Sequence, residues 1–259
     1  MFAELPDVRM YYEDVGEGEP VILIAGLGTN HRFWKTMVPL LEGYRVITLD
    51  NRGVGDTEYT GEITVEGMGD DIIHLMDHLG IARAHILGWS MGAHIAQSLA
   101  ARYQDRVQSL TIVSGYQFRP YRSSYFMYMM IKAAMEGRCT MDEVNVVLNS
   151  FCFPEATFEY LEKQDIIMPV PKHPEDPAQI YAQMMSTVNY DTTGMAKDIT
   201  APTMVIHGGE DIMVEPKKGR AMAESIGAEY FEIPGEGHTI TPERHVGILR
   251  KHFEKNRME

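Results

Sequence analysis

The sequence predicts an α/β fold in which helices cover both faces of a mostly parallel sheet and a helical lid is inserted into the chain. Short apolar runs alternate with amphipathic segments along most of the 259 residues, which is typical of parallel strands joined by helices. This alternation stops between about residues 116 and 195. We therefore expect a core of residues 1–115 and 196–259 and a helical cap of residues 116–195, a size that suits one large domain.

The predicted strands are apolar runs bounded by turn-forming residues. They are PVILIAG (20–26), RVITLD (45–50), AHILGWS (84–90), VQSLTIVSG (107–115), TMVIHG (203–208) and EYFEIPG (229–235). Near the start of the chain, VRMYYEDVG (8–16) is expected to form an antiparallel edge strand.

Apolar residues at helical spacing predict helices between these strands. One stretch follows Thr64 and carries Val65, Met68, Ile72, Leu75, Met76 and Leu79; another follows Ser90 and carries Ile95, Ala96, Leu99 and Ala100; a last one carries Val246, Leu249 and Phe253. Thr64 is a suitable cap for the first helix. Thr241 and Pro242 suit the cap and first position of the last.

The predicted cap is rich in methionine and aromatic residues, most densely in SSYFMYMMIKAAM (123–135). Such side chains can pack a core and can also form an adaptable apolar wall for a substrate. We expect both uses, and take Tyr125 and Met129 as substrate-binding residues on the underside of the cap. The Pro-rich MPVPKHPEDP (168–177) is expected to be a connecting loop.

Composition argues against several classes of partner. The formal net charge is −14 and the isoelectric point is near 5.1, so the chain lacks the excess of Lys and Arg that phosphate binding requires. Cys139 and Cys152 have no metal-ligand spacing and are too few for a disulfide framework. The first residues do not form a basic and apolar signal sequence, and no apolar run is as long as a membrane span. We expect a cytoplasmic protein with no nucleic-acid or membrane partner.

The first group of residues with chemical meaning is Gly88-Trp89-Ser90-Met91-Gly92, where a strand pattern changes to a helix pattern. A sharp turn there forces an uncommon backbone conformation on the serine, and the two glycines remove side chains that would clash. The turn also places the hydroxyl at the start of a helix, where N–H groups favour negative charge. Ser90 is therefore a candidate nucleophile, and Trp89 and Met91 are candidates for shaping the pocket beside it.

A serine hydroxyl needs a base, and the base needs an orienting acid. His238 lies in a glycine-bearing loop directly after the last predicted strand, and Asp211 follows the strand before it. Both would lie at the same edge of the sheet as Ser90, since catalytic groups gather at strand C-termini. Glu210 is a rival acid that the sequence leaves open. The chain order Ser90, Asp211, His238 is the order found in hydrolases with a nucleophile elbow.

An oxyanion site is expected beside Ser90. In Ala25-Gly26-Leu27-Gly28-Thr29-Asn30, glycines after an early strand let a backbone N–H approach a substrate oxygen. We expect that donor to be Leu27, together with the N–H of Met91.

The chain resembles the α/β-hydrolase superfamily over essentially its whole length. The resemblance rests on the Gly-Leu-Gly turn, the segment DNRGVGD (50–56), the elbow around Ser90, and the loops of Asp211 and His238. It implies that Arg52 orients its loop and is no catalyst. The stretch GLGTNHRFW (26–34) is similar to 3-oxoadipate enol-lactonases and to small-ester and amide hydrolases of the aminoacrylate-hydrolase type. Two features depart from that pattern: the cap has no tryptophan, and Ala25 replaces the usual His.

These residues predict a serine hydrolase that cleaves a carboxylic ester or lactone of small size through an acyl-enzyme, without a cofactor or metal. The same triad also serves C–C bond hydrolases and thioesterases, and a low-turnover receptor on this fold is a further alternative. The fold's haloalkane dehalogenases and epoxide hydrolases use an aspartate where this chain has Ser90. His94 and His31 are expected to be structural, and Asp70-Asp71 a solvated helix face.

Overall fold

The computed structural model describes residues 1–164, 166 and 176–258. Most of the loop predicted at 168–177 lies outside the described residues. The strands are β1 (Phe2–Leu5), β2 (Val8–Val15), β3 (Glu19–Ile24), β4 (Tyr44–Leu49), β5 (Glu58–Tyr59), β6 (Ala84–Trp89), β7 (Val107–Val113), β8 (Thr203–Gly208) and β9 (Glu229–Ile233). The helices are α1 (Val65–His78), α2 (Met91–Arg102), α3 (Tyr121–Met135), α4 (Met141–Cys152), α5 (Glu155–Lys163), α6 (Pro177–Val188), α7 (Pro216–Ile226) and α8 (Pro242–Lys255).

The strands form a sheet in the order β1-β2-β4-β3-β6-β7-β8-β9, and β5 also pairs with β2. Every pairing from β4 to β9 along this path is parallel, while β2 is antiparallel to its neighbours. The predicted mostly parallel sheet is therefore confirmed. The expectation that residues 8–16 form an edge strand is wrong, because the short β1 pairs along the outer side of β2, with Phe2 opposite Tyr11.

Two apolar layers hold the sheet between helices. Along β3, Ile22 and Ile24 belong to one buried cluster, whereas Val21 and Leu23 belong to the other, as the alternation of side chains in a strand requires. Helices α1, α2 and α7 contribute to the first cluster, and α8 contributes Leu249 and Phe253 to the second. Helices thus cover both faces, as predicted.

The predicted helix starts are confirmed at two places. The side chain of Thr64 accepts a hydrogen bond from the N–H of Gly67, which caps α1. Thr241 and Pro242 are the cap and first residue of α8. No helix in the described ranges is long and apolar enough to cross a membrane.

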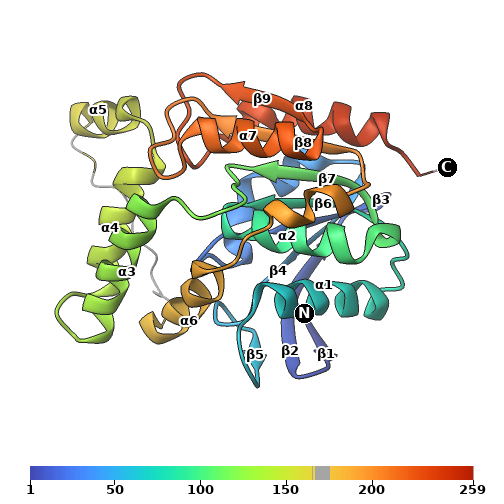
Figure 1. Cartoon of the computed structure of the whole chain (residues 1–259), viewed down its shortest axis with the longest axis horizontal. Helices are drawn as coiled ribbons and strands as arrows, with labels where there is room; N and C mark the ends of the chain where they lie inside the picture. The colour runs from blue at the N-terminus through green and yellow to red at the C-terminus, as the bar shows by residue number, and fades with distance from the viewer. Residues whose placement is uncertain (165, 167–175, 259) are drawn as a thin grey trace.

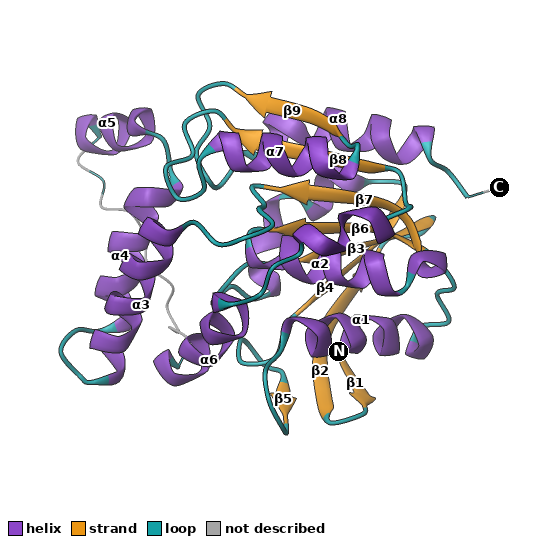
Figure 2. Cartoon of the chain, viewed as in Figure 1, coloured by secondary structure: helices purple, strands orange, loops and turns teal. Residues whose placement is uncertain are grey.

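Helices α3 to α6 lie beyond the arrowheads of β6 to β9, to the left in Figure 1 and Figure 2. They come from the segment expected to form the cap. A small apolar cluster of Ile131, Met141, Val144, Ile180 and Met184 joins α3, α4 and α6. These helices therefore face the edge of the sheet where the parallel strands end.

The expectation for Asp70-Asp71 is half wrong. Asp71 is buried, and its carboxylate accepts hydrogen bonds from Arg52 at 2.6 and 2.8 Å. Asp70 is partly exposed and pairs with Arg102. Burial of Asp71 follows from its partner, since a buried carboxylate needs a paired cation. Arg52 thereby ties its loop to α1, which agrees with the orienting role expected for it.

Candidate active site

Ser90 lies at a tight turn between β6 and α2, with φ 55° and ψ −115°. A positive φ is uncommon for a residue other than glycine and stores strain. The turn is possible because the residues two before and two after Ser90 are glycines, which have no side chain. A Cβ on Gly88 would lie 2.2 Å from the carbonyl oxygen of Gly92, and a Cβ on Gly92 would lie 2.2 Å from the carbonyl oxygen of Ile24. The N–H of Ser90 donates to the carbonyl of Val113, so the turn is also held to β7.

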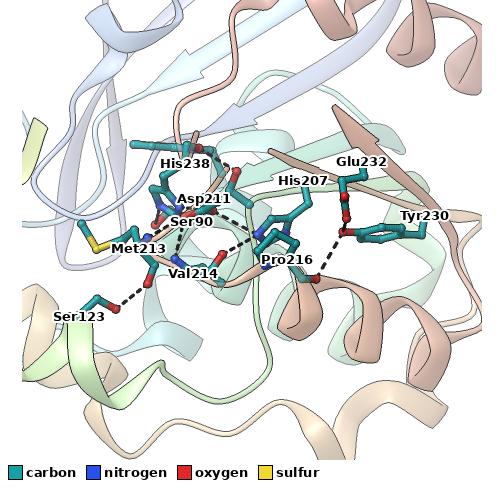
Figure 3. Close-up of polar contacts among 12 residues, drawn as sticks. Ser90, Ser123, His207, Asp211, Met213, Val214, Pro216, Tyr230, Glu232 and His238 are labelled. Atoms are coloured by element: carbon teal, nitrogen blue, oxygen red, sulfur yellow. Dashed lines mark hydrogen bonds and ion pairs between the residues drawn. The ribbon is translucent and has the colours of Figure 1, made fainter. Parts of the chain in front are cut away.

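His238 is buried, and its two ring nitrogens join Ser90 to Asp211 (Figure 3). Nδ1 lies 2.8 Å from Oδ2 of Asp211, and Nε2 lies 2.9 Å from Oγ of Ser90. Because an ionised carboxylate can only accept hydrogen bonds, Nδ1 carries the ring proton. Nε2 is then free to accept the proton of the serine hydroxyl.

Asp211 is a buried carboxylate with donors on both oxygens. Oδ1 accepts from the N–H groups of Met213 at 2.9 Å and Val214 at 2.8 Å. Oδ2 also lies 3.1 Å from Nε2 of His207, on the opposite side from His238. Burial alone would raise the pKa of Asp211, but these two histidines lower it to about 2. The carboxylate therefore stays ionised in its buried position.

Glu210, the rival acid, does not take this place. Its side chain is exposed, and its backbone N–H donates to the carbonyl of Glu236. Asp211, one residue later, is the hydrogen-bond partner of His238.

The backbone of His238 is held separately from its ring. Its carbonyl oxygen accepts from Nε1 of Trp89 at 3.0 Å and from Oγ of Ser114 at 2.8 Å. Trp89 in turn stacks on Phe33, with ring centroids 4.2 Å apart. These contacts fix the loop that carries the imidazole, so Trp89 supports His238 as well as lining the cavity next to it.

The Gly-Leu-Gly turn lies against α6, and Leu27 packs against the apolar cluster that joins α3, α4 and α6. Leu27, Met91 and Ser90 all line the cavity. The N–H of Gly28 donates to Oε1 of Gln183 at 3.0 Å. Within the described ranges, the N–H groups of Leu27 and Met91 have no hydrogen-bond acceptor, and Met91 is the first residue of α2. Two backbone donors beside Ser90 are thus left for a ligand.

The cavity has a volume of about 300 Å³ and lies between the sheet edge and helices α3, α4 and α6. Its walls are mostly apolar. The residues of α3 that line it are Ser123, Ser124, Met127 and Ile131. Tyr125 and Met129, which the sequence suggested as substrate contacts, do not line it; they are 67% and 40% exposed. The helical period explains the correction, since these two residues lie on the other side of α3 from Met127 and Ile131.

Three supporting residues were missed by sequence reasoning. They are Ser114, which has a positive φ of 49°; His207, which adjoins Asp211; and Gln183, a buried residue of α6. Only Ser114 carried a usable signal, because it stands in a Ser-Gly pair at the end of a predicted strand. The roles of His207 and Gln183 depend on side-chain contacts in the folded chain, and local sequence patterns do not predict such contacts.

The histidines expected to be structural have structural partners or surroundings. Nδ1 of His31 lies 2.8 Å from the buried carboxylate of Asp50. His94 is fully buried with its ring against Tyr116 and Tyr190. Burial lowers the pKa of His94 to about 4, so its ring is neutral at neutral pH.

The open sheet, the strained serine between glycines and the buried Ser–His–Asp contacts define the class as an α/β-hydrolase enzyme. Comparison with known proteins agrees: residues 19–135 match the model of the alpha/beta hydrolase fold. The "Putative non-heme bromoperoxidase BpoC" of Mycobacterium tuberculosis is 30% identical over 243 residues, covering 89% of this chain and 91% of the relative. The chain therefore belongs to the α/β-hydrolase family.

Two further similarities lie within this family. 3-Oxoadipate enol-lactonase 1 of Acinetobacter baylyi is 25% identical over 244 residues, which are 90% of this chain and 88% of that protein. A solved thermophilic esterase from Thermogutta terrifontis superposes with a TM-score of 0.85 at 25% identity, over 100% of both chains. The resemblance to enol-lactonases seen in the sequence is thus confirmed.

Proposed function

We propose that this protein is a serine hydrolase that cleaves a small carboxylic ester or lactone through an acyl-enzyme. The observation that carries the proposal is the hydrogen-bonded series from Oγ of Ser90 through the His238 ring to Asp211. A nucleophile, a base in hydrogen-bond reach and an orienting acid are the parts that such a reaction needs. The similar enol-lactonase and esterase support an ester or lactone as the substrate class.

In the proposed first step, Oγ of Ser90 attacks the carbonyl carbon of the substrate while Nε2 of His238 takes the hydroxyl proton. Asp211 holds the imidazole by its Nδ1–H and stabilises the imidazolium that forms. The N–H groups of Leu27 and Met91 receive the negative charge on the carbonyl oxygen. Losing one such donor typically costs about 3 to 4 kcal/mol in the transition state.

The tetrahedral intermediate then collapses. The bond to the leaving oxygen breaks, and His238 gives that oxygen its proton, so the alcohol departs and an ester of Ser90 remains. A water molecule attacks this ester while Nε2 of His238 accepts a proton from the water. His238 returns the proton to Oγ, and the carboxylic acid leaves. No cofactor or metal enters these steps.

We further propose that residues 116–195 act as a cap that encloses the substrate. Residues of α3, α4 and α6 supply much of the cavity wall that faces Ser90 and His238. Their apolar side chains would exclude bulk water, which strengthens the electrostatic contacts around the reacting carbonyl.

The test is hydrolysis of short-chain p-nitrophenyl esters by the purified protein and by Ser90→Ala. We expect release of p-nitrophenol by the parent protein and a loss on the order of 10⁶-fold, down to the assay background, in the variant. Ser150→Ala is a matched control, because Ser150 is exposed on α4 and bonds only to its own helix. A fluorophosphonate probe should label Ser90 alone; stoichiometric labelling elsewhere, or no turnover, would overturn the proposal.

A further inference from the structure

Two asparagines stand one turn apart on the cavity side of α4. Asn145 and Asn149 both line the cavity, and residues separated by four positions share a helix face. The other residues of α4 on this wall are Met141, Leu148 and Cys152. Two carboxamides therefore interrupt an otherwise apolar wall.

Neither carboxamide has a hydrogen-bond partner within the part of the chain that the structure describes. Each offers two donors and two acceptor lone pairs. Two hydroxyls on the wall are already used: Oγ of Ser123 donates to the carbonyl of Met213, and Oγ1 of Thr187 to that of Met184. Both asparagines are partly exposed, so each keeps its donors and acceptors available to a ligand that enters the cavity.

Tyr116 adds a third polar group to the cavity wall. It is only 7% exposed and lines the cavity, and its hydroxyl bonds to no other described residue. Tyr116 belongs to a buried cluster with Met213 and Val214, and Leu148 and Cys152 of α4 pack against this cluster. Burial raises the pKa of this phenol to about 12, so the hydroxyl stays neutral and can donate.

The distance of these groups from the reacting atoms follows from α4 itself. The N–H of Thr239 donates to the carbonyl of Cys152 at 2.9 Å, so the end of α4 rests on the loop of His238. Asn149 and Asn145 precede Cys152 by three and seven residues, about 4.5 and 10.5 Å along the helix axis. A substrate group that meets Asn149 would therefore lie a few bonds from the scissile carbonyl.

We propose that Asn145, Asn149 and Tyr116 form a subsite for an uncharged hydrogen-bonding group of the substrate, such as a ketone, hydroxyl or amide. This rests on the proposed hydrolase function and narrows its substrate class. A cationic group is disfavoured because the cavity wall has no acidic side chain among the described residues. Its one Arg, Arg119, already donates from Nε to the carbonyl of Val188 and stacks on the exposed Tyr121.

The test compares esters that differ in one distal group. On the acyl side, p-nitrophenyl 4-oxopentanoate is compared with p-nitrophenyl pentanoate and with the singly charged mono-p-nitrophenyl butanedioate. On the alcohol side, 4-oxopentyl butanoate is compared with pentyl butanoate. We expect a ketone to raise kcat/KM about 3- to 10-fold in at least one pair, the gain of a neutral hydrogen bond. Asn149→Leu, Asn145→Leu or both should bring that ratio close to 1.

The variants carry their own controls. Val146→Ala changes the exposed side of the same helix and should leave the ratio unchanged. Replacing an unpaired amide by leucine should keep or raise Tm, so loss of selectivity in a stable protein separates ligand binding from a structural role.

The outcomes that would overturn the subsite are distinct from those that concern the triad. Hydrolysis of all the esters with no ketone preference, or with a preference that both leucine variants retain, would refute the subsite and leave the hydrolase proposal in place. Preference for the butanedioate would show that Arg119 recognises a carboxylate instead. No turnover of any ester would overturn both proposals.

Discussion

Replacing Asp211 by asparagine tests the triad sharply, because the surrounding hydrogen bonds fix the orientation of the new amide. Oδ1 of Asp211 accepts from the N–H groups of Met213 and Val214. The amide oxygen of Asn must take this position, since an NH₂ group there would face two donors. The NH₂ group then replaces Oδ2 and points at Nδ1 of His238, 2.8 Å away.

This arrangement reverses the polarity of the contact with His238. The amide donates to Nδ1, so the ring proton moves to Nε2, and Nε2 can no longer accept the proton of Ser90. A change of this kind lowers kcat by about 10⁴-fold in serine hydrolases, which corresponds to about 5.4 kcal/mol at 1.36 kcal/mol per tenfold change. The NH₂ group also meets the donor Nε2 of His207, so a loss of stability is expected as well.

The assay is kcat on a p-nitrophenyl ester at neutral pH, with urea unfolding to show that the variant is folded. Glu210→Gln is the matched control, because it makes the same carboxylate-to-amide change on an exposed neighbour; its kcat should be unchanged. Equal and small losses in the two variants would refute the role of Asp211 and the tautomer argument with it.

Two further predictions concern the supports of the site. Gln183→Leu leaves the N–H of Gly28 and the carbonyl of Arg52 without their partners. Urea unfolding should show that the free energy of unfolding falls by about 1 to 3 kcal/mol, and kcat should fall more than KM rises. An unchanged kcat would contradict a role of Gln183 in positioning the turn. Between pH 6.5 and 4 the unfolded chain binds more protons than the folded one at His94, whose pKa is lowered to about 4 by burial, so stability should fall as the pH falls through this window. In His94→Phe the urea midpoint should depend less on pH between 7 and 5 than in the parent protein; an equal dependence would place the titration elsewhere.

The positions of Ser90, Asp211 and His238 could be predicted because each depends on local pattern. Each follows an apolar strand, and the ends of parallel strands meet at one edge of the sheet. The glycines around Ser90 signal the turn by themselves, since only bare backbone fits the 2.2 Å approaches found there. The predicted strands that correspond to β3, β4, β6, β7 and β8 agree with the observed ones because buried parallel strands are continuous apolar runs.

The failures share a different cause, which is dependence on distant partners. Asp71 is buried because Arg52 reaches it from a loop before α1, and a lone acidic pair in a helix pattern gives no sign of that. On α3, apolar residues lie on several sides of the helix, so the sequence could not say which side faces the cavity. Packing of Ile131 with Ile180 and Met184 of α6 decides it, and this turns Tyr125 and Met129 to the outside.

Gln183 shows how such a distant contact links the proposed cap to the candidate active site. Its side chain lies on α6 yet is fully buried, with Oε1 on the N–H of Gly28 and Nε2 on the carbonyl of Arg52. Because the N–H of Gly28 is occupied, the neighbouring N–H of Leu27 is the donor that we propose for a substrate oxygen. A shift of α6 would remove the acceptor from Gly28 and free the turn to move. The helix that lines the cavity therefore also positions the backbone that would bind the oxyanion, so substitutions that displace Gln183 or α6 should change kcat as well as substrate preference.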